Sequence, residues 1–337
     1  SEVASILTNR VANDIGMTRL FAAIFRETEV PYELVIGCDR MERVLDEDFE
    51  SFLPLQEIML YLPDIDGYLD PAAPAYRAPY ADMSLMATDA LHIRNFELGD
   101  GVTGVGSVRY VPALPDTLNV HDHRFTVTFA EDGTTADIEF ENILMGYPGT
   151  FQVYYDLLDH DTQEELIHGM LEYLIGEEGD PQIDVRYAED IHMGRQPMVM
   201  AGRVETDRFS GFAGERRLFN IGELIGPQVE MYDSVARTLP VEELFNRRYL
   251  REFDITLPEG WVLQNPEDLH FDVRLDLDGE TPMAFVSEYT LDGRKLSVRV
   301  HEYYRTVRLP LEKYPEYRAV INAAADFNKV ALVMGRE

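Results

Sequence analysis

Two histidines two residues apart, His121 and His123, are the side chains in this sequence best placed to bind a transition metal. Side chains at positions i and i+2 of a β-strand point to the same face of the sheet, so both imidazoles could reach one ion. A metal enzyme built on this pair would need a third ligand, and the sequence indicates none. The sequence favours the alternative, a strand whose two histidines face solvent. We therefore predict no resident metal and keep His121 and His123 as candidate ligands only.

Acidic side chains also lie in patterns that could bind hard cations. His160 stands between Asp159 and Asp161, but Asp161 is more simply the N-cap of the helix that follows. The aspartates of residues 272–278 alternate along a predicted strand, and calcium would require six to eight oxygen ligands in a tight loop. An acidic strand edge that discourages aggregation between strands explains the same residues. We expect no cation site in either segment.

The remaining motifs give little support to cofactor binding or nucleophilic catalysis. Residues 99–106 are rich in glycine, but no lysine and helix follow, so no phosphate-binding loop and no cofactor are predicted. Cys38 is the single cysteine and lies in a predicted strand, where we expect a buried thiol. Trp261, Tyr249 and residues 303–304 could form an aromatic platform for sugar or peptide. Such residues in a β domain are more often core and cross-strand pairs.

The composition is that of a folded, strongly acidic protein. Among 337 residues, 62 acidic side chains against 29 basic ones give a net charge of -33. Such a surface repels phosphate backbones and anionic lipids, so nucleic acid is not an expected partner. No run of about 20 apolar residues predicts a membrane span. The rarity of lysine indicates either a salt-loving source or an acidic surface that keeps a secreted or periplasmic protein soluble.

The elements that must position these residues begin with one helix and a few short strands. An apolar stripe at helical spacing starts near Asp14 and ends before Pro31, which predicts a mostly buried helix. Residues 32–38 then form an expected strand. Residues 58–62 and 68–70 flank a turn and predict a hairpin.

Strand patterns dominate the rest of the chain. Residues 124–129 and 135–140 alternate on either side of a turn and are the clearest hairpin in the sequence. One helix is predicted from Asp161 to the glycine at 176, with its apolar residues on one stripe. A second helix is predicted over residues 315–325. Many short strands separated by turns indicate a sandwich-like β domain with one or two helices.

Three segments of the first 95 residues occur in the order of a known family core. Residues 13–31 (NDIGMTRLFAAIFRETEVP) are similar to a Gly-Asp-Cys-Lys-Asp helix start and the helix after it. Residues 55–59 (LQEIM) stand where the family has Phe-Asn-His-Val-Ile, and residues 67–71 (GYLDP) match Tyr-Leu-Asp-Pro-Thr closely. The chain thus resembles the bacterial transglutaminase-like superfamily, in particular its large multidomain Bacteroidetes-type members. The resemblance implies a papain-like core.

The resemblance also places the catalytic triad of that family. Its cysteine position falls on Ile15, its histidine position on Glu57, and only the aspartate is kept, as Asp70. In the family a thiolate at a helix N-terminus attacks, and a histidine oriented by the aspartate transfers protons. Isoleucine cannot attack, and a carboxylate cannot donate a proton at neutral pH without a large rise in its pKa. We therefore predict a degenerate triad with Asp70 as its remnant.

The rest of the chain resembles the C-terminal β region of the family, most clearly at residues 248–263 and 303–317. The family's N-terminal β domain has no counterpart here, so we expect it to be missing from this chain or supplied by another segment. Pattern and resemblance together predict an α+β fold. A degenerate, partial transglutaminase-like unit over residues 1–95 is followed by a large, mainly β, sandwich-like domain over residues 96–337.

These observations predict a non-catalytic, transglutaminase-like protein that acts as a binding or scaffold module for protein or glycan. The expected location is the periplasm, the cell surface or the exterior. Three alternatives stay open: a cysteine hydrolase or transferase whose core a missing segment completes, a metal enzyme built on His121 and His123, and a structural subunit of a surface assembly.

Overall fold

The chain divides into two compact units, with unit 1 comprising residues 1–114 and 189–196 and unit 2 comprising residues 115–188 and 197–337. The boundary expected near residue 95 lies inside a strand of unit 1, and the observed division follows the next strand. The computed structural model describes residues 2–45, 51, 53, 55–98, 101–130, 134–176, 181–187, 194–232 and 236–336.

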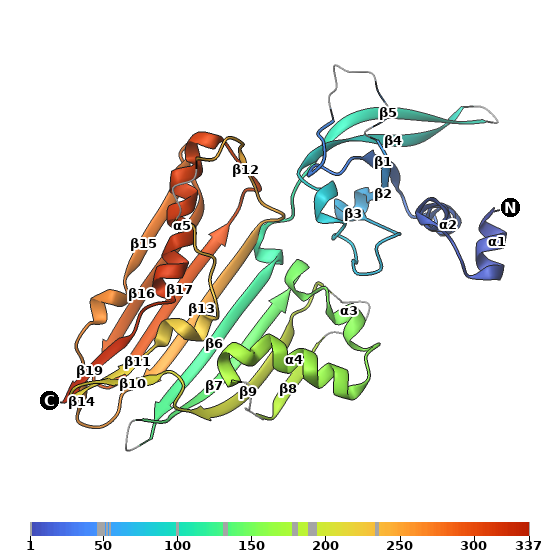
Figure 1. Cartoon of the computed structure of the whole chain (residues 1–337). Helices are drawn as coiled ribbons and strands as arrows, with labels where there is room; N and C mark the ends of the chain where they lie inside the picture. Colours follow the sequence, from blue (N-terminus) through green and yellow to red (C-terminus); the bar gives the residue numbers. More distant parts are fainter. Residues whose placement is uncertain are drawn as a thin grey trace. The chain divides into compact units, whose positions relative to one another are not determined.

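Among the described residues, unit 1 contains a five-stranded antiparallel sheet in the order β3-β2-β1-β4-β5, together with two helices (Figure 1). The predicted strand and hairpin of this region are confirmed as β1 and as β2 with β3. The elements are α1 (Glu2–Asn9), α2 (Asp14–Glu27), β1 (Glu33–Gly37), β2 (Glu57–Leu62), β3 (Gly67–Leu69), β4 (Thr88–Leu98) and β5 (Gly101–Val111).

Helix α2 begins at Asp14, as its sequence predicts, but it is less buried than expected. The Asn13 side chain caps it by accepting a hydrogen bond of 2.9 Å from the Gly16 amide. The apolar residues Ile15 and Ile24 are each 46% exposed. The helix packs against α1 and β2. An apolar stripe therefore predicted the helix correctly but not how much of it is covered.

Among the described residues, unit 2 is built on an eight-stranded sheet in the order β15-β16-β17-β13-β6-β7-β9-β8. Strands β13 and β6 run parallel, and the other neighbours are antiparallel. The hairpin predicted from residues 124–129 and 135–140 is confirmed, although its turn at 131–133 lies outside the described residues. The strands are β6 (Val120–Phe129), β7 (Ala136–Met145), β8 (Ile183–Arg186), β9 (Met198–Thr206), β13 (Arg247–Thr256), β15 (Phe271–Leu277), β16 (Glu280–Asp292) and β17 (Lys295–Tyr304).

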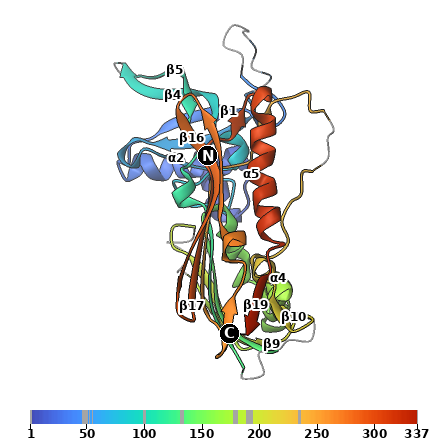
Figure 2. The same cartoon turned by 90° about the vertical axis from the view of Figure 1, so that its left-hand side faces the viewer.

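One face of this sheet carries the core of unit 2. Figure 2 shows the sheet edge-on, with helices and a smaller sheet on one side of it. Phe129 contacts Phe219 of the smaller sheet, and Phe285 contacts Phe327 of α5, with ring centroids 5.1 and 5.9 Å apart. The covering elements are α4 (His160–Ile175), α5 (Tyr314–Phe327), β10 (Ser210–Ala213), β11 (Arg216–Phe219), β14 (Trp261–Leu263) and β19 (Leu332–Arg336).

The opposite face of the sheet carries exposed ion pairs. Arg124 contacts Glu141 at 3.1 Å and Glu252 at 3.2 Å, and Arg299 contacts Glu252 at 3.4 Å. Strand alternation puts these charges on one side and the apolar core on the other. The predicted α+β class, with a large β domain and few helices, is confirmed. In the part of the chain that the structure describes, no helix has the length and apolar character that a bilayer crossing requires.

Candidate functional site

The three positions that the resemblance assigns to a catalytic triad lie in one hollow of unit 1. Ile15 belongs to the first turn of α2, Glu57 is the first residue of β2, and Asp70 directly follows β3. All three line a space of about 550 Å³, which we call the acidic hollow. Five carboxylates and several uncharged residues line it: Asp14, Asp39, Glu57, Asp70, Asp82, Asn13, Ile15, Gln56, Ile58, Ala72, Ala73, Ser84 and Leu85.

Local structure explains why these three positions converge. The N-cap of α2 fixes the start of that helix, and Gly16 leaves room for it because an added Cβ would come within 3.1 Å of Ala12. Antiparallel pairing of Leu60 with Leu69 returns the end of β3 alongside the start of β2. The three positions that the sequence resemblance singled out therefore lie close together in the fold.

The acidic hollow contains carboxylates with unfavourable surroundings for their charge. Partial desolvation, followed by the charges of Asp70 and Asp14, raises the pKa of Glu57, although the residue as a whole is exposed. Burial also raises the pKa of Asp70, which is 9% exposed, against the hydrogen bonds from the Ala72 and Ala73 amides, which lower it. Nothing among the described lining residues supplies a thiol or an imidazole. The hollow can attract a positive or hydroxyl-bearing group, but it has no thiolate with which to attack an acyl group.

Several of these carboxylates also have local structural roles. Asp70 accepts a hydrogen bond of 3.0 Å from the Ala72 amide. Asp82 accepts one of 2.9 Å from Ser84, and Asp39 accepts one of 2.8 Å from the Met41 amide. Turns with aspartate bonded to an amide two residues on are a common local motif. The fold alone therefore accounts for these three aspartates.

Cys38 is a buried thiol, as its sequence context predicts. It follows β1, is 1% exposed, and its Sγ donates to the carbonyl of Arg43 at 3.4 Å. Burial raises the pKa of this thiol, which opposes formation of a thiolate. It does not line the acidic hollow.

A buried polar pair in unit 1 escaped the sequence analysis. His92 on β4 is 2% exposed, and its Nε2 lies 3.2 Å from the hydroxyl of Tyr68 on β3. Burial lowers the pKa of His92. Because β4 does not border the acidic hollow, this imidazole is not brought to Asp70. Only the sheet order, which sets β3 and β4 on either side of β1 and β2, could have predicted the pair.

His121 and His123 do not face solvent, which corrects the favoured interpretation of their sequence. They lie on β6 with ring centroids 4.5 Å apart, and His123 is 3% exposed. Their side of the strand is the one covered by helices. No group of three or more histidine, cysteine or acidic side chains able to hold a metal occurs among the described residues. The expected common face is therefore present, but the third ligand is not.

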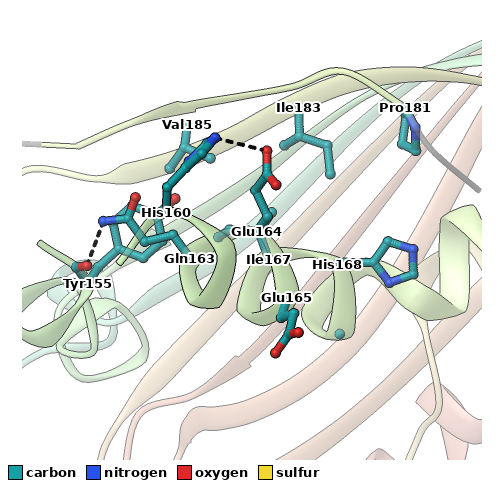
Figure 3. Close-up of a pocket in the computed structure, with 11 residues that line it drawn as sticks. Tyr155, His160, Gln163, Glu164, Glu165, Ile167, His168, Pro181, Ile183 and Val185 are labelled. Atoms are coloured by element: carbon teal, nitrogen blue, oxygen red, sulfur yellow. Dashed lines mark hydrogen bonds and ion pairs between the residues drawn. The ribbon is translucent and has the colours of Figure 1, made fainter. Parts of the chain in front are cut away.

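The segment around His160 forms a groove of about 610 Å³ between α4 and β8 (Figure 3). His160 Nε2 lies 3.3 Å from Glu164 Oε1, yet these side chains are 79% and 69% exposed, so water competes with any ligand. Asp159, not Asp161, is the N-cap of α4 and accepts a hydrogen bond of 3.0 Å from Thr162. Asp161 lies inside the first turn instead, and the predicted end at Gly176 is confirmed.

Only Tyr249 and Tyr304, of the four aromatic residues considered as a platform, lie together. Tyr303 and Tyr304 are consecutive on β17 and so point to opposite faces of the sheet, with Tyr249 near Tyr304 at a ring distance of 6.5 Å. Trp261 lies in the smaller sheet, with the Arg217 guanidinium 4.4 Å from its ring centre. Tyr249 and Tyr304 line one cavity of unit 2, whereas Tyr303 and Trp261 pack with other neighbours, so the four residues form no single platform.

No family model and no curated protein matches this sequence. One solved structure that resembles the fold is described as a "putative protease" from Parabacteroides distasonis. It is 12% identical in sequence with a TM-score of 0.47, and the match covers 98% of this chain and 46% of that one. This chain therefore spans about half the length of that protein.

Proposed function

We propose that this chain is a non-catalytic, transglutaminase-like binding module that recognises positively charged protein segments outside the cytoplasm. The observation that carries the proposal is the acidic hollow, where Ile15, Glu57 and Asp70 meet without a nucleophile. The sequence resemblance supports a transglutaminase-like fold, and the absence of a thiol and an imidazole from the described lining of the hollow supports a role without acyl transfer.

The lack of catalysis follows from what each position can do. Acyl transfer by a cysteine enzyme requires a thiolate, a base that takes its proton and a group that orients the base. Ile15 offers hydrocarbon at the first position, and Glu57 carries a carboxylate at the second. The thiol of Cys38 is buried and its pKa is raised. No described residue therefore replaces the missing nucleophile at the hollow.

The choice of a positively charged partner rests on the five carboxylates of the acidic hollow. Mutual repulsion contributes to the raised pKa of Glu57 and Asp70, and a lysine or arginine side chain would relieve it. Ile15 and Leu85 add apolar surface that an alkyl stem can cover. The net charge of -33 would draw such a segment in.

The catalytic half of the proposal is tested with a thiol-reactive activity probe and an amine-transfer assay on peptide substrates. We expect no turnover and only slow labelling of the protein. Turnover that is abolished by Cys38→Ala would overturn the proposal and favour a cysteine enzyme.

The binding half is tested by titrating fluorescent peptides that contain lysine or arginine, with neutral peptides and oligosaccharides for comparison. Glu57→Gln and Asp14→Asn should each weaken binding of the basic peptide about two- to fivefold at low salt, and less at high salt. Asp64→Asn is the matched control, because Asp64 is an exposed acid of unit 1 that does not line the hollow. Equal losses in all three variants, or tighter binding of the neutral peptide, would contradict the proposal.

A further inference from the structure

Unit 2 contains a cavity of about 390 Å³ on the covered face of its large sheet, and we call it the polar cavity. Its floor consists of residues from the neighbouring strands β7, β6, β13 and β17. Helices α4 and α5 and residues 225–229 form its walls. Val229 at its edge is 68% exposed, so the cavity adjoins solvent there.

Five polar atoms that line the polar cavity lack a hydrogen-bond partner among the described residues. Three belong to side chains that are almost fully buried, His123, Asn142 and Arg251, which are 3%, 4% and 2% exposed. The atoms are His121 Nε2, His123 Nδ1, Asn142 Oδ1, Tyr173 OH and Arg251 Nε. Buried polar groups in folded proteins are normally bonded, so a cluster of exceptions in one cavity requires an explanation.

Core packing does not require polar residues at these positions, because β6 and β13 carry buried apolar residues further along the same face. On β6, His121 and His123 are followed at the same spacing by Phe125 and Val127, both buried in the core. On β13, Arg251 is followed in the same way by Phe253. Aliphatic or aromatic side chains could have continued into the cavity. The change from apolar to polar coincides with the cavity itself.

The charges around the polar cavity are already balanced. Arg251 donates to Glu302 at 2.7 Å, and the other carboxylate oxygen of Glu302 accepts from the Tyr304 hydroxyl at 2.7 Å. Arg247 donates to Glu243 at 2.7 Å. Burial, with the Arg251 charge second, lowers the pKa of His121 to about 4 against an interaction with the Asn142 side chain that raises it, so this imidazole is neutral at pH 7. No unbalanced charge is left to select an anion or a cation.

The unpartnered atoms instead call for a ligand that both donates and accepts hydrogen bonds. Arg251 Nε can only donate, and Asn142 Oδ1 can only accept. A neutral imidazole offers one donor and one acceptor, and the Tyr173 hydroxyl can do either. A carboxylate or phosphate ligand would leave Asn142 Oδ1 without a partner. Hydroxyl groups match the whole set, since each both donates and accepts.

We propose that the polar cavity binds a small, uncharged, polyhydroxylated ligand, a monosaccharide or a polyol. Met170, Ile321 and Ala324 line the same cavity and offer apolar surface for the C–H groups of such a ligand. The volume of about 390 Å³ lies within the range of small-molecule sites. This inference does not depend on the function proposed for unit 1.

The test measures binding of neutral sugars and polyols to the full chain by calorimetry and thermal shift. Glucose, galactose, mannose, N-acetylglucosamine and inositol are compared with gluconate and glucosamine, which add a negative or a positive charge at similar size. We expect at least one neutral compound to bind and the two charged analogues to bind more weakly. Failure of every neutral compound, or tighter binding of a charged analogue, would overturn the proposal.

Two variants separate a ligand site from a structural feature. Tyr173→Phe removes only an unpartnered hydroxyl, and Asn142→Leu removes an unpartnered carbonyl at similar volume. Each should weaken sugar binding roughly three- to tenfold or more while the unliganded melting temperature stays equal or rises. Tyr154→Phe, at a side chain 48% exposed outside the cavity, should change neither quantity.

The opposite pattern, a lower melting temperature with unchanged sugar binding, would assign the cavity polar groups to folding and refute the site. A crystal structure with ordered water alone in the cavity at saturating sugar would refute it as well. Glu57→Gln in unit 1 should leave sugar binding unchanged, so failure of the peptide proposal can be told apart from failure of this one.

Discussion

The acidic hollow of unit 1 and the polar cavity of unit 2 differ in how their polar groups are satisfied. In the hollow, Asp70, Asp82 and Asp39 each accept a hydrogen bond from a nearby backbone amide. In the cavity, His123 and Asn142 are almost fully buried and leave atoms without partners among the described residues. Local structure explains the first set of residues, whereas the second set still requires a partner.

This difference shows that a segment resembling a family motif does not by itself identify the functional site. The hollow was located through a resemblance, and its described lining residues include no thiol. The sequence singled out His121 and His123 as a pair, but it did not link them to the other residues of the cavity, which come from strands and helices far apart in the chain. Unsatisfied buried groups therefore point to function where sequence patterns are silent.

The largest expected effect concerns the buried ion pair beside the polar cavity. Arg251 and Glu302 side chains are 2% and 5% exposed, and Glu302→Leu would leave the guanidinium buried without its partner. We expect unit 2 to lose about 3–5 kcal/mol in the free energy of unfolding, measured by urea denaturation followed by hydrogen exchange of each unit.

Asp82→Ala is the corresponding variant in the acidic hollow, to be compared with Glu302→Leu in its free energy of unfolding. It removes one cap bond to Ser84 and should destabilise unit 1 by only about 1 kcal/mol. The double variant Arg251→Met with Glu302→Leu should recover much of the loss, because no buried charge remains. If Glu302→Leu and Asp82→Ala lowered the free energy of unfolding by similar amounts, the proposed difference between the two regions would be wrong.

The next effect is that the two regions respond to acid in opposite directions. The unfolded chain protonates its histidines near pH 6.5, whereas the pKa of His121 in unit 2 is about 4. The unfolded state thus binds more protons between these values, so unit 2 loses stability as the pH falls from 6.5 to 4. At pH 5 this single group accounts for about 2 kcal/mol.

In unit 1, Glu57 and Asp70 change the stability in the opposite direction as the pH falls. Their pKa values are raised in the fold, so the folded state keeps protons that the unfolded chain has already released. Lowering the pH from 7 towards 5 should therefore stabilise unit 1 at these two groups, and the lowered pKa of His92 opposes this gain within the same unit. Hydrogen exchange at pH 7 and pH 5, corrected for intrinsic rates, should show protection falling in β6 and rising in β2. A variant with His121→Gln and His123→Gln should flatten the response of unit 2, and parallel changes in both units would refute this prediction.

The smallest expected effect concerns position 15, where the resembled family has its cysteine. Ile15 and Ile24 lie on the same helix and are both 46% exposed, so Ile15→Cys and Ile24→Cys form a matched pair. A helix N-terminus favours a thiolate, but it carries only about half a unit charge, and five carboxylates surround position 15. The Ile15→Cys thiol should therefore react with iodoacetamide about two- to fivefold more slowly at low salt.

Added salt should bring the two alkylation rates together, since it screens the carboxylates. Faster reaction of Ile15→Cys at every salt concentration would show that the hollow still activates a thiol. That result would mean that only one side chain separates this chain from a cysteine nucleophile.

Elements with local signals were predictable from the sequence. Helix α2 begins where Asn13 caps it, and the β6–β7 hairpin follows from alternating residues around a short turn. The position of the N-cap of α4 was misplaced by two residues, because Asp159 and Asp161 are equally good caps and only the backbone conformation selects the first. Local chemistry thus determines which elements form, with small errors at their ends.

Exposure was less predictable because it depends on what packs against an element. The apolar stripe of α2 predicted burial, yet Ile15 and Ile24 remain largely exposed. Conversely, two histidines expected to face solvent lie under helices that follow β6 by some 40 and 190 residues. Strand alternation places His121 and His123 on one face, but it does not state which face is covered.

By itself, the amino-acid sequence determined the α+β class, helix α2 and the β2–β3 and β6–β7 hairpins, because local periodicity and turn residues decide these properties. Only the tertiary structure brought Ile15, Glu57 and Asp70 into one hollow, and only it buried His121, His123, Asn142 and Arg251 around one cavity. Contacts between residues that are distant in the chain depend on strand order and on helix packing, which no local pattern encodes.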